Sequence, residues 1–73
     1  MGRLRVLSGR QGCRILEGHG FVEVRRRGSH VVMQRRTQES TVTVPVPDHS
    51  EIKTGTPLSI IRQSGILRSE FES

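Results

Sequence analysis

The sequence predicts a single α+β domain, in which one helix, three antiparallel strands and a second helix span residues 1–73. Two observations support this prediction. The middle of the chain holds three short runs of strand-forming residues separated by turn residues. Each end carries a helical segment with recognisable start and stop signals. A chain of this length buries only about 60% of its unfolded surface, so two helices on one face of a three-stranded sheet would enclose a small core.

The first helix is expected to begin after Ser8. Gln11 stands three residues later, which is the spacing of a capping box, in which each side chain satisfies the other's backbone donor. About three turns are expected, with Gly20 as the stop. Gly12 and Gly18 each cost about 1 kcal/mol relative to alanine, so tertiary packing must hold this helix. Its expected apolar contacts are Cys13, Ile15 and Leu16.

Three strands are expected in the middle of the chain, over residues 21–26, 30–35 and 41–44. Gly28-Ser29 forms the first turn, and the polar residues 36–40 form the second. The third run is β-branched throughout, which makes it the strongest strand signal. Pro45 and Pro47 are expected to end its ladder, because neither can donate a backbone hydrogen bond.

The second helix is expected to start with Thr56 as the cap and Pro57 at the first helical position, after a polar connection over residues 48–51 that has room for one helical turn. Leu58 and Ile61 form an i, i+3 apolar pair, and Gly65 is the stop. Phe71 is expected to dock on the core. This order and handedness match a double-stranded-RNA-binding domain.

Composition narrows the classes of partner. Eleven arginines and Lys53 outweigh seven carboxylates and give a net charge of +5, which points to a polyanion or an acidic protein. The only aromatic residues are Phe21 and Phe71, which favours contacts to phosphate and sugar over base stacking. One cysteine, Cys13, allows no intramolecular disulfide, and the basic N-terminus has no apolar run behind it. These features predict a cytoplasmic protein with no signal peptide and no membrane span.

Positive charge is concentrated in Arg25-Arg26-Arg27, which leads through the Gly28-Ser29 turn to His30. Guanidinium groups donate two parallel hydrogen bonds to phosphate. Histidine, with an ordinary pKa of about 6.5, can take and give a proton at cellular pH. This hairpin tip therefore combines a phosphate grip with a proton-transfer group. The competing interpretation is a solvated basic turn with an incidental histidine, which composition alone favours.

The other candidate residues carry weaker signals. His49 could be a second proton-transfer group, although a loop histidine that caps the next turn is the favoured interpretation. His19 at the end of the first helix and Cys13 on its apolar side are interpreted as structural. The single cysteine and three scattered histidines do not make a zinc spacing, and the carboxylates are too dispersed for magnesium. We expect no metal and no cofactor.

The chain resembles the HicA toxins of bacterial HicAB toxin–antitoxin modules over residues 8–71. The resemblance rests on an ordered set of short motifs: Ser8-Gly9, Gly20-Phe21, Arg26-x-Gly28-Ser29-His30, Val44-Pro45-Val46-Pro47-x-His49, Gly55-Thr56-Pro57-Leu58-x-x-Ile61-Arg62-Gln63-Ser64-Gly65 and Phe71. It implies a double-stranded-RNA-binding-like fold, a metal-independent mRNA endonuclease with His30 as the catalytic residue, and a HicB antitoxin as partner. The chain departs from the family at Gly12 and His19, where apolar residues are usual, and at Pro57, where leucine is frequent.

Two functions remain in competition. The first is a ribonuclease toxin in which His30 transfers protons, while Arg25, Arg26 and Arg27, with Gly28 and Ser29, bind the phosphate of mRNA. The second is a non-catalytic double-stranded-RNA-binding module of the same fold, in which the arginines grip a duplex. A pure binder should not depend on one titrating group, so His30 discriminates between them.

Overall fold

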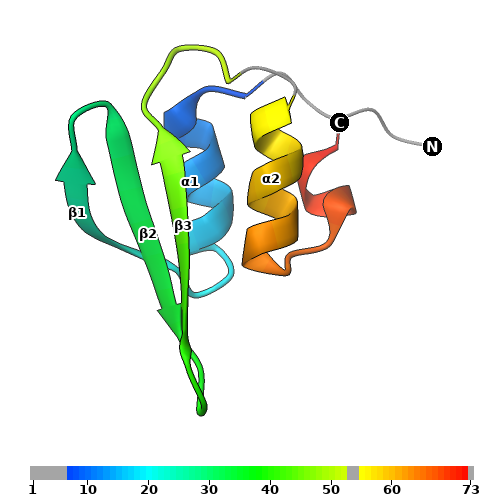
Figure 1. The fold of residues 1–73 in the computed structure, drawn as a ribbon. Helices are drawn as coiled ribbons and strands as arrows, with labels where there is room; N and C mark the ends of the chain where they lie inside the picture. The colour runs from blue at the N-terminus through cyan, green and yellow to red at the C-terminus, as the bar shows by residue number, and fades with distance from the viewer. Residues whose placement is uncertain (1–6, 53–54, 73) are drawn as a thin grey trace.

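The computed structural model describes residues 7–52 and 55–72 and confirms the predicted order of elements (Figure 1). Residues 1–6, for which the sequence predicted neither a signal peptide nor a membrane span, lie outside the described residues, as does Lys53. The elements are α1 (Gly9–Glu17), β1 (Val22–Arg27), β2 (His30–Arg36), β3 (Thr41–Pro47), α2 (Gly55–Ser64) and a 3₁₀ turn, η1 (Arg68–Phe71). Within the described ranges, no helix is long and apolar enough to cross a membrane.

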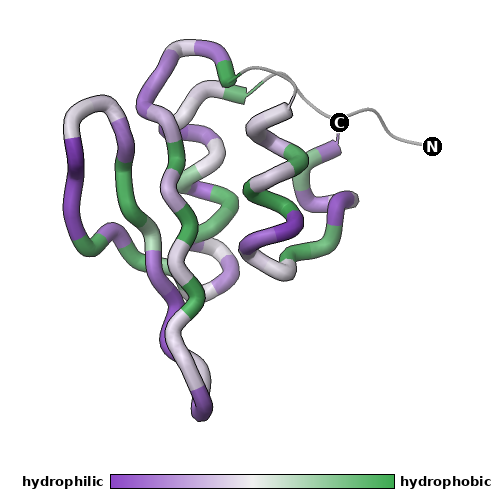
Figure 2. Tube along the Cα trace, in the orientation of Figure 1, coloured by the Kyte–Doolittle hydropathy of each residue, from purple (hydrophilic) through white to green (hydrophobic). Residues whose placement is uncertain are grey.

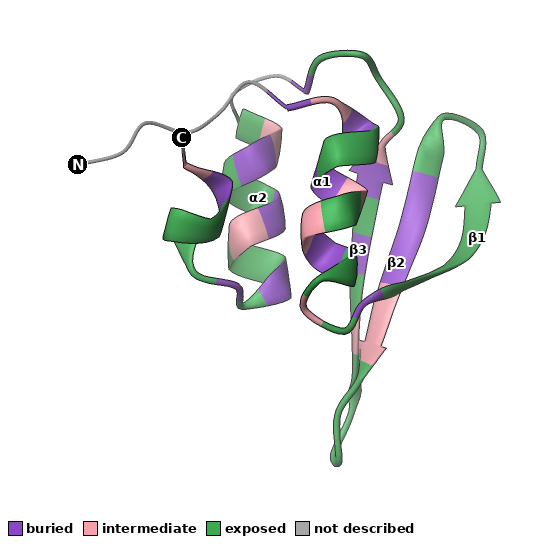
Figure 3. Cartoon of the chain, turned by 180° about the vertical axis from the view of Figure 1, so that it is seen from behind, coloured by how far each residue is buried: buried purple, intermediate pink, exposed green. Residues whose placement is uncertain are grey.

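The three strands form one antiparallel sheet in the order β1-β2-β3, with both helices on one face. The helices gather at the β3 side, whereas β1 stands apart and all six of its residues are exposed (Figures 1 and 3). The core lies between the helices and strands β2 and β3. Its most deeply buried side chains are Phe21, Phe71, Leu16, Met33, Val44, Val46 and Ser64. This is the predicted double-stranded-RNA-binding-like architecture.

Helix α1 begins as predicted. The Ser8 hydroxyl accepts a hydrogen bond from the Gln11 amide at 3.1 Å, and the Gln11 side chain accepts one from the Ser8 amide at 2.9 Å. The last helical residue is Glu17, and Gly18 is the C-cap. Gly20 (φ +90°) is the predicted stop, because its amide donates to the Glu17 carbonyl at 3.2 Å and the Phe21 amide donates to the Leu16 carbonyl at 3.1 Å, which are the hydrogen bonds of a glycine-terminated helix end.

Strand β3 is longer than predicted. Pro45 and Pro47 do not end the ladder but lie within the strand, opposite Val32 and His30 of β2. An edge strand tolerates this because a proline can direct its missing donor away from the neighbouring strand. The two prolines occupy alternate positions, so both face the same side of the sheet. That side is the outer face, because the intervening Val46 is buried.

The start of α2 also differs from the prediction. The helix begins at Gly55, so Thr56 and Pro57 lie in its first turn, where amides have no intrahelical partner and proline is tolerated. Its buried stripe is Pro57, Ile60 and Ser64, and Leu58 is exposed. Residues 48–51 form no helical turn. The predicted stop at Gly65 (φ +73°) and the docking of Phe71 are confirmed.

An added methyl group should have opposite effects on the stability of the fold at two glycines of α1. A Cβ at Gly9 would collide with the carbonyl oxygen of Pro47, whereas a Cβ at Gly12 would meet Ile52 and Val46 at 3.6 and 3.7 Å, which is ordinary contact. We expect Gly12→Ala to raise the free energy of unfolding by about 1 kcal/mol, because it removes a glycine from a helix interior. Gly9→Ala should lower it by about 1–3 kcal/mol through overpacking.

Urea titrations of the two variants and the parent chain, followed by circular dichroism, measure both effects. Equal changes in the two variants would contradict the close approach of α1 to β3.

Candidate active site

The tip of the β1–β2 hairpin has a defined geometry. Arg27 and His30 are opposite each other across the two strands, and Gly28-Ser29 is the two-residue turn between them. Gly28 has a φ of +56° and Ser29 has no positive φ, which are the φ signs of a type II′ hairpin turn. The Ser29 carbonyl accepts a hydrogen bond from the Asp48 amide at 2.6 Å. The turn that precedes His30 is therefore tied to the end of β3.

The register divides the three consecutive arginines between the two faces of the sheet. Arg26 is opposite Val31, which is buried against the helices, so Arg26 lies on the helix face. Arg27 is opposite His30 and Arg25 is opposite Val32, so both lie on the outer face with His30. A bulge between Glu23 and Arg25 sets this alternation. In Figure 2 the end of β1 next to the turn is hydrophilic, whereas the start of the strand alternates between hydrophilic and hydrophobic residues.

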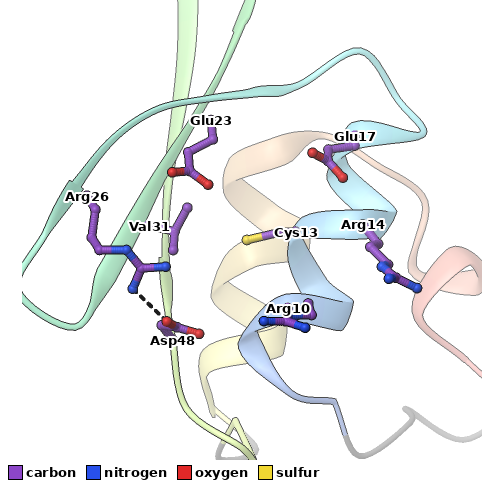
Figure 4. A pocket seen from close by; sticks show the side chains of 8 residues that line it. All are labelled: Arg10, Cys13, Arg14, Glu17, Glu23, Arg26, Val31 and Asp48. Carbon is purple, nitrogen blue, oxygen red and sulfur yellow. Dashed lines mark hydrogen bonds and ion pairs between the residues drawn. The ribbon is translucent and has the colours of Figure 1, made fainter.

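On the helix face, Arg26 is paired with Asp48. A guanidinium nitrogen of Arg26 lies 2.5 Å from Asp48 Oδ2 (Figure 4). This hydrogen bond lowers the pKa of the Asp48 carboxyl and raises the pKa of Arg26. The stabilisation is present above the ordinary pKa of the carboxyl and is lost as the pH falls through the lowered value. Both side chains are about half exposed, so solvent keeps the energy of the pair small.

The Arg26–Asp48 pair borders a pocket of about 250 Å³ between α1 and strands β1 and β2. Its walls combine both signs of charge with the Cys13 thiol (Figure 4). Burial, followed by the nearby Glu17 carboxylate, raises the pKa of Cys13 and so disfavours its thiolate form. The predicted core position of Cys13 is confirmed in part, because it packs against the core but is only half-buried. The lining residues are Arg10, Cys13, Arg14, Glu17, Glu23, Arg26, Val31 and Asp48.

A second hollow, between β3 and α2, includes His30 itself. It has a volume of about 220 Å³, and none of the described residues that line it is an arginine, a lysine or a carboxylate. His30 is exposed on β2, and the prolines of β3 stand beside it. The opposite wall is the polar side of α2. The lining residues are His30, Pro45, Pro47, Thr56, Ser59, Ile60 and Gln63, and we call this hollow the β3–α2 groove.

The remaining predicted residues lie elsewhere. His49 is exposed after β3, and its carbonyl accepts a hydrogen bond from the Gly9 amide at 2.8 Å, so its backbone anchors α1. It is not part of the β3–α2 groove. His19 Nε2 lies 3.1 Å from Glu70 Oε1 and connects the end of α1 to η1, in keeping with a structural role. Among the residues that the structure describes, no group of three or more His, Cys, Asp or Glu side chains is placed to hold a metal ion.

Sequence reasoning missed the contribution of Asp48 and of α2. Asp48 was interpreted as part of a polar connection, yet it binds the hairpin through both its amide and its carboxylate. Ser59 carried no signal, and Thr56 and Gln63 were interpreted only as a helix cap and as part of the family motif. Their shared i, i+3, i+7 spacing places them on one side of a helix, but only the position of α2 beside β3 brings that side to His30.

A scan against protein-family models matches residues 9–66 to the family described as "HicA toxin of bacterial toxin-antitoxin". A search of the curated proteins gives no match. The matched range runs from the first residue of α1 to just beyond α2 and contains the whole sheet and the β3–α2 groove. The chain therefore belongs to the HicA family, the toxins of bacterial toxin–antitoxin systems.

Proposed function

We propose that this toxin is a metal-independent endoribonuclease that cuts mRNA in the cytoplasm, with His30 as its catalytic residue. The observation that supports this most is the pairing of His30 with Arg27 on the outer face of the sheet, with Arg25 on the same face. All three residues are exposed, so an RNA strand can reach them together. Gly28 and Ser29 are exposed between them and complete the proposed phosphate contact.

The proposed reaction is attack of a ribose 2′-OH on the adjacent phosphorus. It needs a base to take the 2′-OH proton, an acid to protonate the leaving 5′-oxygen, and positive charge for the phosphorane. His30 serves as one of the two proton-transfer groups. A water molecule supplies the other, since His49, the second candidate from the sequence, is not part of the groove that includes His30. Arg25 and Arg27 stabilise the phosphorane, because a guanidinium fork binds two phosphate oxygens at once.

Arg26 has a different role in this proposal. Its guanidinium lies on the helix face and is held by Asp48, which also binds the turn through Ser29. Arg26 therefore supports the hairpin tip, while its two neighbours contact the phosphate. The alternative, a non-catalytic double-stranded-RNA-binding module, would use the same arginines without needing His30.

His30→Ala should reduce cleavage of a long mRNA by about 100-fold or more, the usual contribution of a general acid or base, while circular dichroism shows an unchanged fold. His49→Ala is the matched control, since it also removes an exposed imidazole near the end of β3 and should keep most of the activity. A folded His30→Ala protein that cleaves at the parent rate would refute the assignment. Equal losses in the two variants would make His49 the second proton-transfer group.

The same cleavage assay in EDTA tests metal independence. No described carboxylate or histidine cluster offers a metal site, so full activity is expected in the chelator. Loss of cleavage that magnesium restores would show that a metal takes part.

The arginines are separable by salt dependence. The slope is that of the logarithm of the RNA-binding constant plotted against the logarithm of the salt concentration. In the His30→Ala background, Arg27→Gln should make this negative slope shallower by about 0.7, because one phosphate contact with a single strand is lost. Arg26→Gln removes the same charge from the other face and should leave the slope nearly unchanged. Binding of a single-stranded RNA, measured by fluorescence anisotropy from low to high salt, gives both slopes. Equal reductions would show that Arg26 also contacts phosphate.

A HicA toxin works in a pair with a cognate antitoxin, and we infer that this antitoxin is HicB-like and covers the outer face of the hairpin. Acidic groups facing Arg25 and Arg27 would speed encounter and orient docking, while burial of His30 would exclude RNA. Hydrogen exchange in the complex should therefore show new protection over residues 25–32. An antitoxin that neutralises the toxin but leaves these amides as exposed as in the free chain would have to inhibit by another route.

A further inference from the structure

We propose that the β3–α2 groove is a base-binding subsite that selects the cleavage position on single-stranded RNA, with Gln63 and Ser59 as the specificity-determining residues. This inference rests on the proposed function and deepens it. The groove opens beside His30, so a nucleotide that holds its phosphate at His30 and Arg27 can direct its base toward α2.

The size of the groove limits its occupant. Its volume of about 220 Å³ lies below the roughly 300–1,000 Å³ of pockets for drug-sized ligands. A single base fits this scale better than a dinucleotide or the side of a duplex. A base can enter such a hollow only when it is unpaired and turned out of a stack. The groove therefore favours a substrate that is single-stranded at the cleavage site.

The chemistry of the walls favours a base over a phosphate. The β3 wall is formed by the rings of Pro45 and Pro47, which offer an apolar surface to a flat ligand. The α2 wall presents the Ser59 hydroxyl and the Gln63 amide, and neither side chain forms a hydrogen bond with any other described residue. Neutral donors and acceptors of this kind bind base edges, whereas phosphates are bound chiefly by arginine and lysine.

The placement of charge agrees with this division. The guanidinium groups of Arg25 and Arg27 lie on β1, across β2 from the groove, so cationic and neutral polar groups flank His30 on opposite sides. An RNA strand bound across the outer face would have its phosphates near the arginines of β1 and one of its bases near the neutral polar groups of α2. Affinity would then come mainly from one side of His30 and sequence preference from the other.

Mapping every cleavage site on a long mRNA by sequencing of the new ends tests the subsite. The parent chain should prefer one base next to the cut. Gln63→Ala should reduce that preference roughly 5- to 150-fold, the range for a bidentate contact to a base edge. Ser59→Ala should shift it less. Gln38→Ala, an exposed glutamine in the β2–β3 turn, is the matched control and should keep the parent spectrum.

An unchanged cleavage spectrum in folded, active Gln63→Ala and Ser59→Ala proteins would overturn the subsite while leaving the nuclease assignment intact. If Gln63→Ala does not fold, Ser59→Ala carries the test.

A binding measurement separates the two proposals. His30→Ala protein is titrated with single-stranded RNA hexamers that differ at one position. The amide chemical shifts of residues 59 and 63 should then change in a way that depends on the base at that position. Such shifts, together with a parent chain that cuts no RNA, would support the subsite and refute the nuclease. RNA binding with no response at these residues would overturn the subsite.

Discussion

The backbone at the end of β3 is the junction on which the geometry of the site depends. The His49 carbonyl accepts from the Gly9 amide at the start of α1, and the Asp48 amide donates to the Ser29 carbonyl in the hairpin turn. Both bonds join backbone groups, so they persist whatever the charge of the neighbouring side chains. They connect α1, β3 and the turn before His30, three parts of the chain that lie far apart in sequence. The tip that carries His30 is consequently exposed to solvent and still fixed to the body of the domain.

The two-residue period of a strand determines how the arginine triplet can be used. Successive side chains point to opposite faces, so three consecutive arginines in β1 cannot all meet one ligand. The register leaves Arg25 and Arg27 on the outer face and brings Arg26 to Asp48 on the other. The positive charge that a partner on the outer face meets is therefore smaller than the triplet suggests. In exchange, the middle arginine helps to hold the hairpin against the end of β3.

Local signals predicted much of the fold, and long-range contacts account for most of the rest. The capping box at Ser8, the glycine turn at Gly28 and the order of the strands could be predicted because each depends on a few adjacent residues. The place of Pro45 and Pro47 inside β3 could not, since the sequence does not tell which strand is an edge. The Arg26–Asp48 pair spans 22 residues, and the β3–α2 groove exists only because α2 packs beside β3. His30 was proposed from its motif, whereas its surroundings required the tertiary structure.

The aromatic content of the chain limits how it could hold an RNA strand. Phe21 and Phe71 are 1% and 0% exposed, so both are committed to the core and neither can stack on a base. Stacking is worth roughly 1–3 kcal/mol per base in proteins that use it, and that contribution is missing here. A single-stranded ligand would be held mainly by phosphate contacts, which are sensitive to salt and indifferent to sequence. A preference for a base would then depend largely on hydrogen bonds beside His30, and the Ser59 and Gln63 side chains of the β3–α2 groove, which bond to no other described residue, offer them.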